Sequence, residues 1–192
     1  MERKKRSYTK PPPSRKYNLV LIIAEGKRED GYFKKLKERK TNIQIEIIHR
    51  EDGVSSPKYA FDRLNDFKLD TDWNQLDGDE VWFVFDIDNW GTQLTELIDA
   101  CQKESNHYTA ISNPCFEVWL HYHSNETLQP MNAQELKTHL PKQPLGQYSA
   151  VTFVSNITVA ITNAKAADTN PDADIPELMQ TKVYKLAQRL IH

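Results

Sequence analysis

The sequence predicts an α/β fold in which a parallel sheet of about four strands is covered by helices on both faces. Two continuous apolar runs, residues 17–24 and 81–85, are typical of strands that are buried on both sides. Between residues 17 and 124, expected strands alternate with segments of helical apolar spacing. Such alternation indicates βαβ units, in which the strands run parallel and the helices cross over the sheet.

The segment between the two apolar runs predicts two helices and one strand. An amphipathic helix is expected over residues 29–40. Residues 43–48 alternate between apolar and polar side chains, which predicts a second strand near an edge of the sheet. Ser56 is expected to cap a further helix and Pro57 to begin it, and this helix runs to about residue 67.

After the second apolar run the alternation continues. A helix is expected over residues 90–104 and a short strand over residues 107–111. Residues 112–114 (Ser-Asn-Pro) predict a helix start, because a polar cap is followed by proline at the first helical position. We expect that helix to continue to residue 123.

From about residue 125 the pattern becomes mostly helical. Three helices are expected, over residues 133–139, 150–166 and 176–191. The predicted organisation is therefore a basic, Pro-rich arm over residues 1–16, an α/β core over 17–124, and a mostly helical extension over 125–192 that packs on the core.

The composition is that of a folded protein in a reducing compartment. Apolar residues make up 39% of the chain, and no apolar run approaches the roughly 20 residues that a membrane span needs. We do not expect the basic, Pro-rich N-terminus to act as a secretory signal, because it has no apolar segment. Two cysteines, Cys101 and Cys115, are too few for a disulfide scaffold and lack zinc-site spacing. We therefore expect a cytoplasmic protein that does not enter the membrane.

The net charge of −2 hides an asymmetry along the chain. Residues 1–16 hold seven basic residues and one acidic residue, a net charge of +6, so the remainder carries −8. A basic arm in front of an acidic body is compatible with nucleic-acid contact. A solvated, disordered tail is the alternative interpretation.

Acidic side chains follow two of the expected strands. Glu25 follows the first apolar run, and Asp86 and Asp88 follow the second. The carboxyl ends of parallel strands share one edge of the sheet, where α/β folds bind ligands. Three carboxylates gathered there would repel each other unless a divalent ion lies among them, and Mg²⁺ favours such ligands. The alternative is that the acids form a turn in which Asp88 or Asn89 caps the next helix.

Further charged residues accompany this set. Lys27 and Arg28 begin a helix, where backbone amides already favour an anion, and they are candidates to bind a substrate phosphate. Glu117 near the start of a later helix either extends the acidic site or faces the helix dipole. We interpret His121 and His123 as ordinary helix residues. The sequence order assembles no Ser-His-Asp set and no P-loop.

At these places the sequence resembles known families. The acids that follow two apolar strands, at Glu25 and at residues 86–88, resemble the Toprim domain of topoisomerases, primases and OLD-type nucleases. Three blocks in order resemble the RloB family more specifically: AEGKREDGYF at 24–33, FDIDNW at 85–90 and SNPCFEVWL at 112–120. The closing TKVYKL at 181–186 is similar to that family's C-terminal helix, so the resemblance spans roughly residues 17–192.

The resemblance implies a Toprim-like, Rossmannoid fold and a place in bacterial anti-phage or restriction-associated loci. Small Toprim proteins there are typically paired with an ABC-type ATPase. It implies that Glu25 is the general acid/base, and that Asp86 and Asp88, with Glu25 beside them, bind Mg²⁺ or alternatively Mn²⁺. Glu117 lies in a matching motif and is a second catalytic candidate. Asn89 and Trp90 follow the second aspartate, where many Toprim nucleases carry further acids.

The leading hypothesis is therefore a Mg²⁺-dependent nuclease that acts as a phage-defence (abortive-infection) effector with an ATPase partner. The alternative is a non-catalytic module that binds nucleic acid or the ATPase. Whether the nucleic acid is DNA or RNA, and whether the chain forms a homo-oligomer, stay open.

Overall fold

A computed structural model describes residues 17–39, 42–50, 55–71, 73, 76–87, 90–124 and 128–191. These residues form a sheet with the strand order β2-β1-β3-β4-β5. The first four strands pair in parallel and the last is antiparallel to its neighbour. Their bounds are β1 Asn18–Ala24, β2 Ile43–Ile47, β3 Glu80–Asp86, β4 His107–Asn113 and β5 Gln180–Thr181. The predicted α/β class is confirmed, and β5 is a strand that was not predicted.

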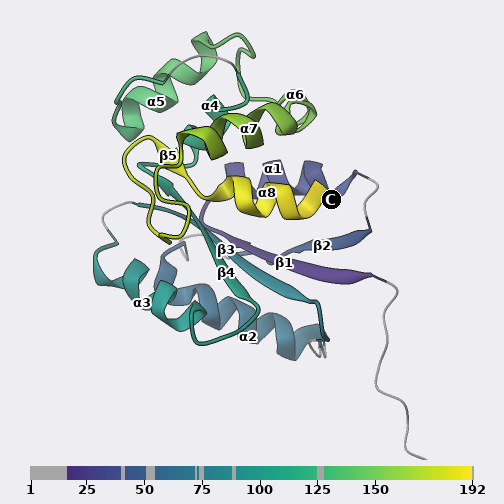
Figure 1. Ribbon diagram of the computed structural model, residues 1–192. Helices are drawn as coiled ribbons and strands as arrows, with labels where there is room; N and C mark the ends of the chain where they lie inside the picture. Colours follow the sequence, from purple (N-terminus) through teal and green to yellow (C-terminus); the bar gives the residue numbers. More distant parts are fainter. Residues whose placement is uncertain are drawn as a thin grey trace, which may run out of the picture.

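Helices cover both faces of the sheet (Figure 1). The helices α2 (Ala60–Thr71) and α3 (Thr92–Cys101) lie below it, and α1 (Lys27–Lys37) and α8 (Val183–Ile191) lie above it. Alternate residues of each strand enter different cores. Leu21 and Phe83 pack with α2 and α3, whereas Ile22 and Val84 pack with α1 and α8. The central strands are apolar on both sides because both sides are covered.

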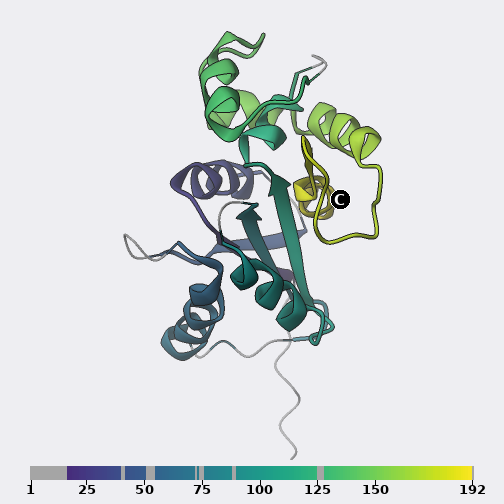
Figure 2. The ribbon, with the colours of Figure 1, turned by 90° about the vertical axis from the view of Figure 1, so that its left-hand side faces the viewer.

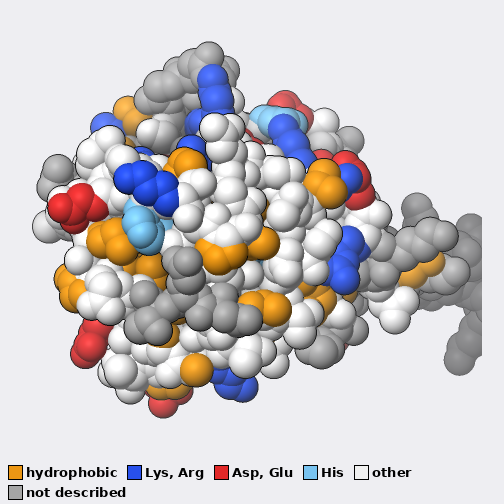
Figure 3. Space-filling model, turned by 90° about the horizontal axis from the view of Figure 1, so that it is seen from above, with side chains coloured by type: hydrophobic (Ala, Val, Ile, Leu, Met, Phe, Trp, Pro, Cys, Tyr) orange, Lys and Arg blue, Asp and Glu red, His pale blue; other side chains and the backbone are white. Residues whose placement is uncertain are grey.

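The C-terminal extension adds a third layer above α1 and α8 (Figure 2). The helices of this layer are α4 Glu117–His121, at the end of the predicted core, and from the extension α5 Ala133–His139, η2 Leu140–Lys142, α6 Ala150–Ser155 and α7 Ile157–Ala167. Leu136, Phe153 and Ala160 from this layer are buried in the same core as α1 and α8. From above, this face shows separate charged side chains with apolar ones between them (Figure 3). In the described residues no helix is long and apolar enough to cross a membrane.

The helix start predicted at residues 112–114 is wrong. β4 continues to Asn113, where Ser112 and Asn113 pair with Thr181 and Gln180 of β5. The Ser112 and Thr181 hydroxyls are 2.8 Å apart, and α4 begins only at Glu117. Pairing with a distant strand therefore satisfies the polar groups that the local pattern assigns to a helix cap.

Two predicted C-terminal helices are also corrected. The segment expected as one helix over 176–191 contains Met179 at φ 64° and then β5, so α8 begins at Val183. A left-handed residue interrupts a helix. The helix expected over 150–166 is divided at Asn156 into α6 and α7.

Two cap predictions have different outcomes. Pro57 begins the short helix η1 (Pro57–Tyr59) that leads into α2, but Ser56 makes no side-chain cap. Its carbonyl oxygen accepts instead from the Tyr59 amide, at 3.1 Å. Gly91 occupies the cap position of α3, and Asp88 and Asn89, the caps of the alternative interpretation, lie outside the described residues.

Candidate active site

The structure brings Glu25 and Asp86 together at the carboxyl edge of the sheet. The parallel register pairs Ala24 with Val84, so the two chains leave their strands side by side. The Glu25 amide donates to the Val84 carbonyl at 3.0 Å, and the Asp86 amide donates to Glu25 Oε2 at 3.0 Å. The Trp90 indole donates to the same carboxylate oxygen at 3.4 Å. These donors fix the direction of the Glu25 side chain.

Asp86 lies on the last residue of β3 and is 9% exposed. Its partner in the sheet is Ser112, whose carbonyl oxygen accepts from the amide of Ile87 at 2.8 Å. The backbone at Asp86 is therefore held by the Glu25 carboxylate before it and by the Ser112 carbonyl oxygen after it. Asp88, the other predicted metal ligand, lies outside the described residues.

The donor chemistry at this edge fits a hard divalent cation. Mg²⁺ is bound by one or two carboxylates, with water and substrate phosphate completing its octahedron. Glu25 and Asp86 supply two carboxylates from adjacent strands. No group of three His, Cys, Asp or Glu side chains suited to a metal occurs within the described residues. The described part of the site is thus a pair of acids.

Glu117, the other predicted catalytic acid, is buried and forms an ion pair with Arg28. The neighbouring Cys115 thiol has a raised pKa, first because of burial and then because of the negative charges of Glu117 and Asp86. The carboxylates of Glu117 and Asp86 therefore act on one and the same thiol. The structure places Glu117 at the periphery of the acid pair, with its charge balanced by Arg28.

Lys27 and Arg28, predicted together as phosphate ligands, diverge at the start of α1. Arg28 turns towards the C-terminal layer, where its guanidinium lies 5.5 Å from the ring centre of Tyr148. The Tyr148 hydroxyl donates to the Arg28 carbonyl oxygen at 3.2 Å. Lys27 instead lines a hollow that includes His49 and Arg50, which follow β2.

Glu29 is a buried acid of this site that was not among the candidates. Its side chain is buried, with 6% exposed, and this burial raises its pKa to about 7. A hydrogen bond from its own backbone amide lowers the pKa, whereas the negative charges of Glu25 and Glu117 raise it further. A Cβ atom built on Gly26 would lie 2.1 Å from Glu29 Oε2. The Glu29 carboxylate therefore folds back over Gly26, and only glycine leaves room for it there. The spacing Gly-x-x-Glu at the helix start was the available signal.

Two arginines that were also not predicted fasten the ends of the first two strands. Arg63 of α2 donates to the carbonyl oxygens of Ala24 at 2.9 Å and of Ile48 at 2.8 Å. Arg50 donates to the Glu25 carbonyl oxygen at 2.7 Å. Burial lowers the pKa of Arg63 to about 10. These hydrogen bonds fix the backbone at Ala24 and Glu25.

His123 lies in the turn just after α4, not in the helix as interpreted from the sequence, and its contacts there are structural. Its Nδ1 lies 2.9 Å from the carbonyl oxygen of Trp119, which can only accept, so Nδ1 carries the proton. Nε2 then accepts from the Tyr32 hydroxyl at 2.9 Å. Burial lowers the pKa of His123 to about 4, which keeps the ring neutral.

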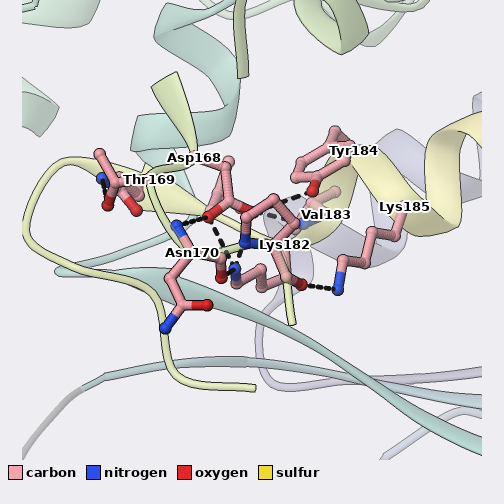
Figure 4. A network of polar contacts seen from close by, with 10 residues as sticks. Asp168, Thr169, Asn170, Lys182, Val183, Tyr184 and Lys185 are labelled. Atoms are coloured by element: carbon pink, nitrogen blue, oxygen red, sulfur yellow. Dashed lines mark hydrogen bonds and ion pairs between the residues drawn. The ribbon is translucent and has the colours of Figure 1, made fainter. Parts of the chain in front are cut away.

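The TKVYKL segment, whose Lys182 amide donates to Ile111 of β4, takes part in a buried polar network (Figure 4). The Lys182 ammonium donates to both oxygens of Asp168, at 2.8 and 2.7 Å, and to the Asn170 carbonyl oxygen at 2.6 Å. The Tyr184 hydroxyl donates to Asp168 at 2.8 Å. Thr181, one residue before the lysine, contacts Ser112, the partner of Asp86 in the sheet. The network therefore anchors the strand that supports the acid pair.

Comparison with known proteins assigns the family. A search of curated proteins and a search of solved structures each returned no match. A family model described as RloB-like protein matches residues 20–190. That match covers the acid pair, Glu117 and the Lys182 network, and far more than half of the chain. The chain therefore belongs to the RloB-like protein family.

Proposed function

We propose that this protein is a Mg²⁺-dependent, Toprim-type nuclease that cleaves a phosphodiester bond of nucleic acid. The observation that carries the proposal is the 3.0 Å hydrogen bond from the Asp86 amide to the Glu25 carboxylate. It joins acids from two parallel strands at the edge where α/β sheets bind ligands. Two carboxylates at such a place suit metal-assisted hydrolysis.

The chain's residues divide the work as follows. Asp86 and Asp88, with Glu25 beside them, would hold Mg²⁺, or Mn²⁺ in its place. Such an ion polarises a phosphodiester oxygen and lowers the pKa of a bound water. Glu25 is oriented by the amide of Asp86 and the indole of Trp90. It acts as the general acid/base that takes a proton from the attacking oxygen or gives one to the leaving oxygen.

Two further residues support the acid pair in this proposal. Arg28 is partly exposed and is ion-paired with Glu117, so a substrate phosphate that binds it would compete with that carboxylate. Glu117 is the second candidate for proton transfer, because its carboxylate is buried close to the same edge.

The biological setting is proposed from family membership. An RloB-like protein fits a cytoplasmic effector of bacterial phage defence that is held or triggered by an ABC-type ATPase. The rival is a module of the same system that binds nucleic acid or the ATPase without turnover. Assays with and without an ABC-type ATPase, taken from a neighbouring gene if one is found there, therefore belong to the test.

The decisive experiment measures cleavage of DNA and of RNA in Mg²⁺ and in Mn²⁺. Glu25→Gln and Asp86→Asn should each lower the cleavage rate by at least about 100-fold, because each removes a charge that the reaction uses. Glu38→Gln is the matched control, since Glu38 is an exposed acid at the far end of α1. Cleavage that is unchanged in both site variants refutes the catalytic assignment. Binding by the wild type without cleavage, in both metals and with the ATPase present, favours the rival module.

A further inference from the structure

A cavity of about 300 Å³ lies beside the candidate active site, between the start of α1 and the segment that follows β2. Its lining is unusually rich in basic side chains. The lining residues are Lys27, Asp30, Gly31, Lys34, His49 and Arg50. A phosphate group is much smaller than this volume, so one backbone phosphate and part of its sugar can enter.

The cavity is joined directly to the acid pair. Arg50 lines it and donates to the Glu25 carbonyl oxygen at 2.7 Å. Lys27, on the same wall, comes two residues after Glu25. If one phosphate of a polynucleotide lies at the acid pair, the neighbouring phosphate of the same strand therefore lies close to this cavity.

The cavity carries an excess of positive charge. Among the described residues that line it, Lys27, Lys34 and Arg50 are three cations against the carboxylate of Asp30. Asp30 lies 3.7 Å from Arg50 and is 8% exposed, so its role is to hold the arginine. A cavity with this balance attracts an anion and concentrates it.

Lys34 differs from the other lysines in the second half of α1. Lys35 pairs with Glu38 and Lys37 pairs with Glu46, so their charges are balanced on the surface. Within the described residues Lys34 has no carboxylate at ion-pair distance, although it is exposed and lines the cavity. Its charge is therefore available to a ligand in the cavity.

We propose that this cavity binds a non-scissile phosphate of a polynucleotide and so aligns the neighbouring phosphodiester with Glu25. The inference rests on the proposed function for the choice of a polynucleotide as the anion. It adds Lys34, His49 and Arg50 to the substrate contacts and places the substrate on the β2 side of the acid pair. The contacts are with phosphate, which DNA and RNA share.

The test measures equilibrium binding rather than turnover. Fluorescence anisotropy follows a labelled duplex DNA and a labelled duplex RNA of the same sequence, with EDTA present so that no cleavage occurs. Lys34→Glu is compared with Lys37→Glu, the same charge reversal on the same helix outside the cavity. Lys34→Glu should weaken binding at least about 10-fold and lower the slope of log K against log salt by about one. Lys37→Glu should change the affinity less than about 3-fold.

Each outcome bears on the proposal. Equal weakening by the two variants means diffuse surface attraction and overturns the cavity as a site. The proposal is also overturned if the wild-type protein binds neither nucleic acid, or if Lys34→Glu binds as tightly as the wild type. A stronger effect on one nucleic acid than on the other identifies the substrate and supports the site.

The same experiment separates this inference from the proposed nuclease activity. Loss of binding in Lys34→Glu with cleavage unaffected by Glu25→Gln retains the cavity and rejects the catalytic assignment. Loss of cleavage in Glu25→Gln with normal binding by Lys34→Glu retains the catalytic assignment and rejects the cavity as a binding site.

Discussion

Replacing Lys182 by Met should destabilise the protein strongly, because it leaves a buried carboxylate without its cation. The side chains of Lys182 and Asp168 are each 1% exposed. Removing one partner of a buried ion pair typically costs about 3–5 kcal/mol. Tyr184 and the Asn170 amide still donate to Asp168 in the variant, so we expect the lower end, about 3 kcal/mol. That is a large share of the total stability of about 5–15 kcal/mol of a folded domain.

Thermal and urea unfolding followed by circular dichroism measures this cost. For a chain of this size about 3 kcal/mol corresponds to a fall in Tm of about 6–12 °C. Lys185→Met is the matched control. Lys185 lies three residues further on, in α8, where it is only half-buried, and its ammonium donates to one carbonyl oxygen, that of Pro171. The control should lose less than about 1 kcal/mol.

A second variant tests the cause of the loss. If the cost of Lys182→Met comes from the stranded charge of Asp168, the double variant Lys182→Met with Asp168→Asn should be more stable than the single one. A single variant that unfolds at the same temperature as Lys185→Met refutes the argument. So does a double variant whose losses simply add.

Three further predictions follow from buried or tightly placed groups. The pKa of His123 is about 4 in the folded protein and about 6.5 when unfolded, so its contribution to stability is present above pH 6.5 and is lost as the pH falls towards 4. Relative to His123→Phe, the wild type should lose about 2 kcal/mol between pH 7.5 and pH 5 in urea unfolding, and a constant difference refutes this. Gly26→Ala should destabilise the protein by about 1 kcal/mol, because the new Cβ atom displaces the Glu29 carboxylate. In a double-mutant cycle, Gly26→Ala should cost little once Glu29 is replaced by Ala. Losses that simply add contradict a contact between residues 26 and 29. Gly91→Ala should cost about 1 kcal/mol through backbone strain, because φ is 53° and no atom of the described residues lies within 4 Å of the added Cβ; an unchanged Tm refutes the strain.

The pairing of Glu25 with Asp86 was predictable because it needs only strand direction. Each acid directly follows an apolar run, and parallel strands end at one edge. The spacing of apolar residues distinguished the core strands from the helices, and the order of these elements gave the correct fold class. Fold class and acid pair both depend on periodicity and order along the chain, which local sequence carries.

The fate of residues 112–114 was not predictable in this way. Ser-Asn-Pro is a good local helix start, yet Ser112 pairs with Thr181, 69 residues away. The network of Lys182 and Asp168 fixes the short strand that takes this place. A long-range pairing of this kind overrides local preference and leaves no periodic trace in a strand of two residues.

Glu29 shows the same limit at the site. A glutamate in the first turn of a helix is ordinarily explained by the helix dipole. Its burial against Gly26 depends on the side chains that cover α1, among them Tyr148 of the C-terminal layer, whose own pKa is raised to about 12, first by burial. The sequence places that tyrosine more than a hundred residues away, so the covering could be seen only in the folded chain.

The separation of Lys27 and Arg28 decides where a substrate is expected to lie. Adjacent residues on a helix point about 100° apart, so two neighbouring cations at a helix start serve different sides. Arg28 is occupied by the buried carboxylate of Glu117, and a phosphate on that side must compete with it. Lys27 lines a cavity whose described lining residues carry more positive than negative charge. An extended polyanion that reaches Glu25 therefore gains more on the β2 side than on the Glu117 side, and charge balance alone favours that path.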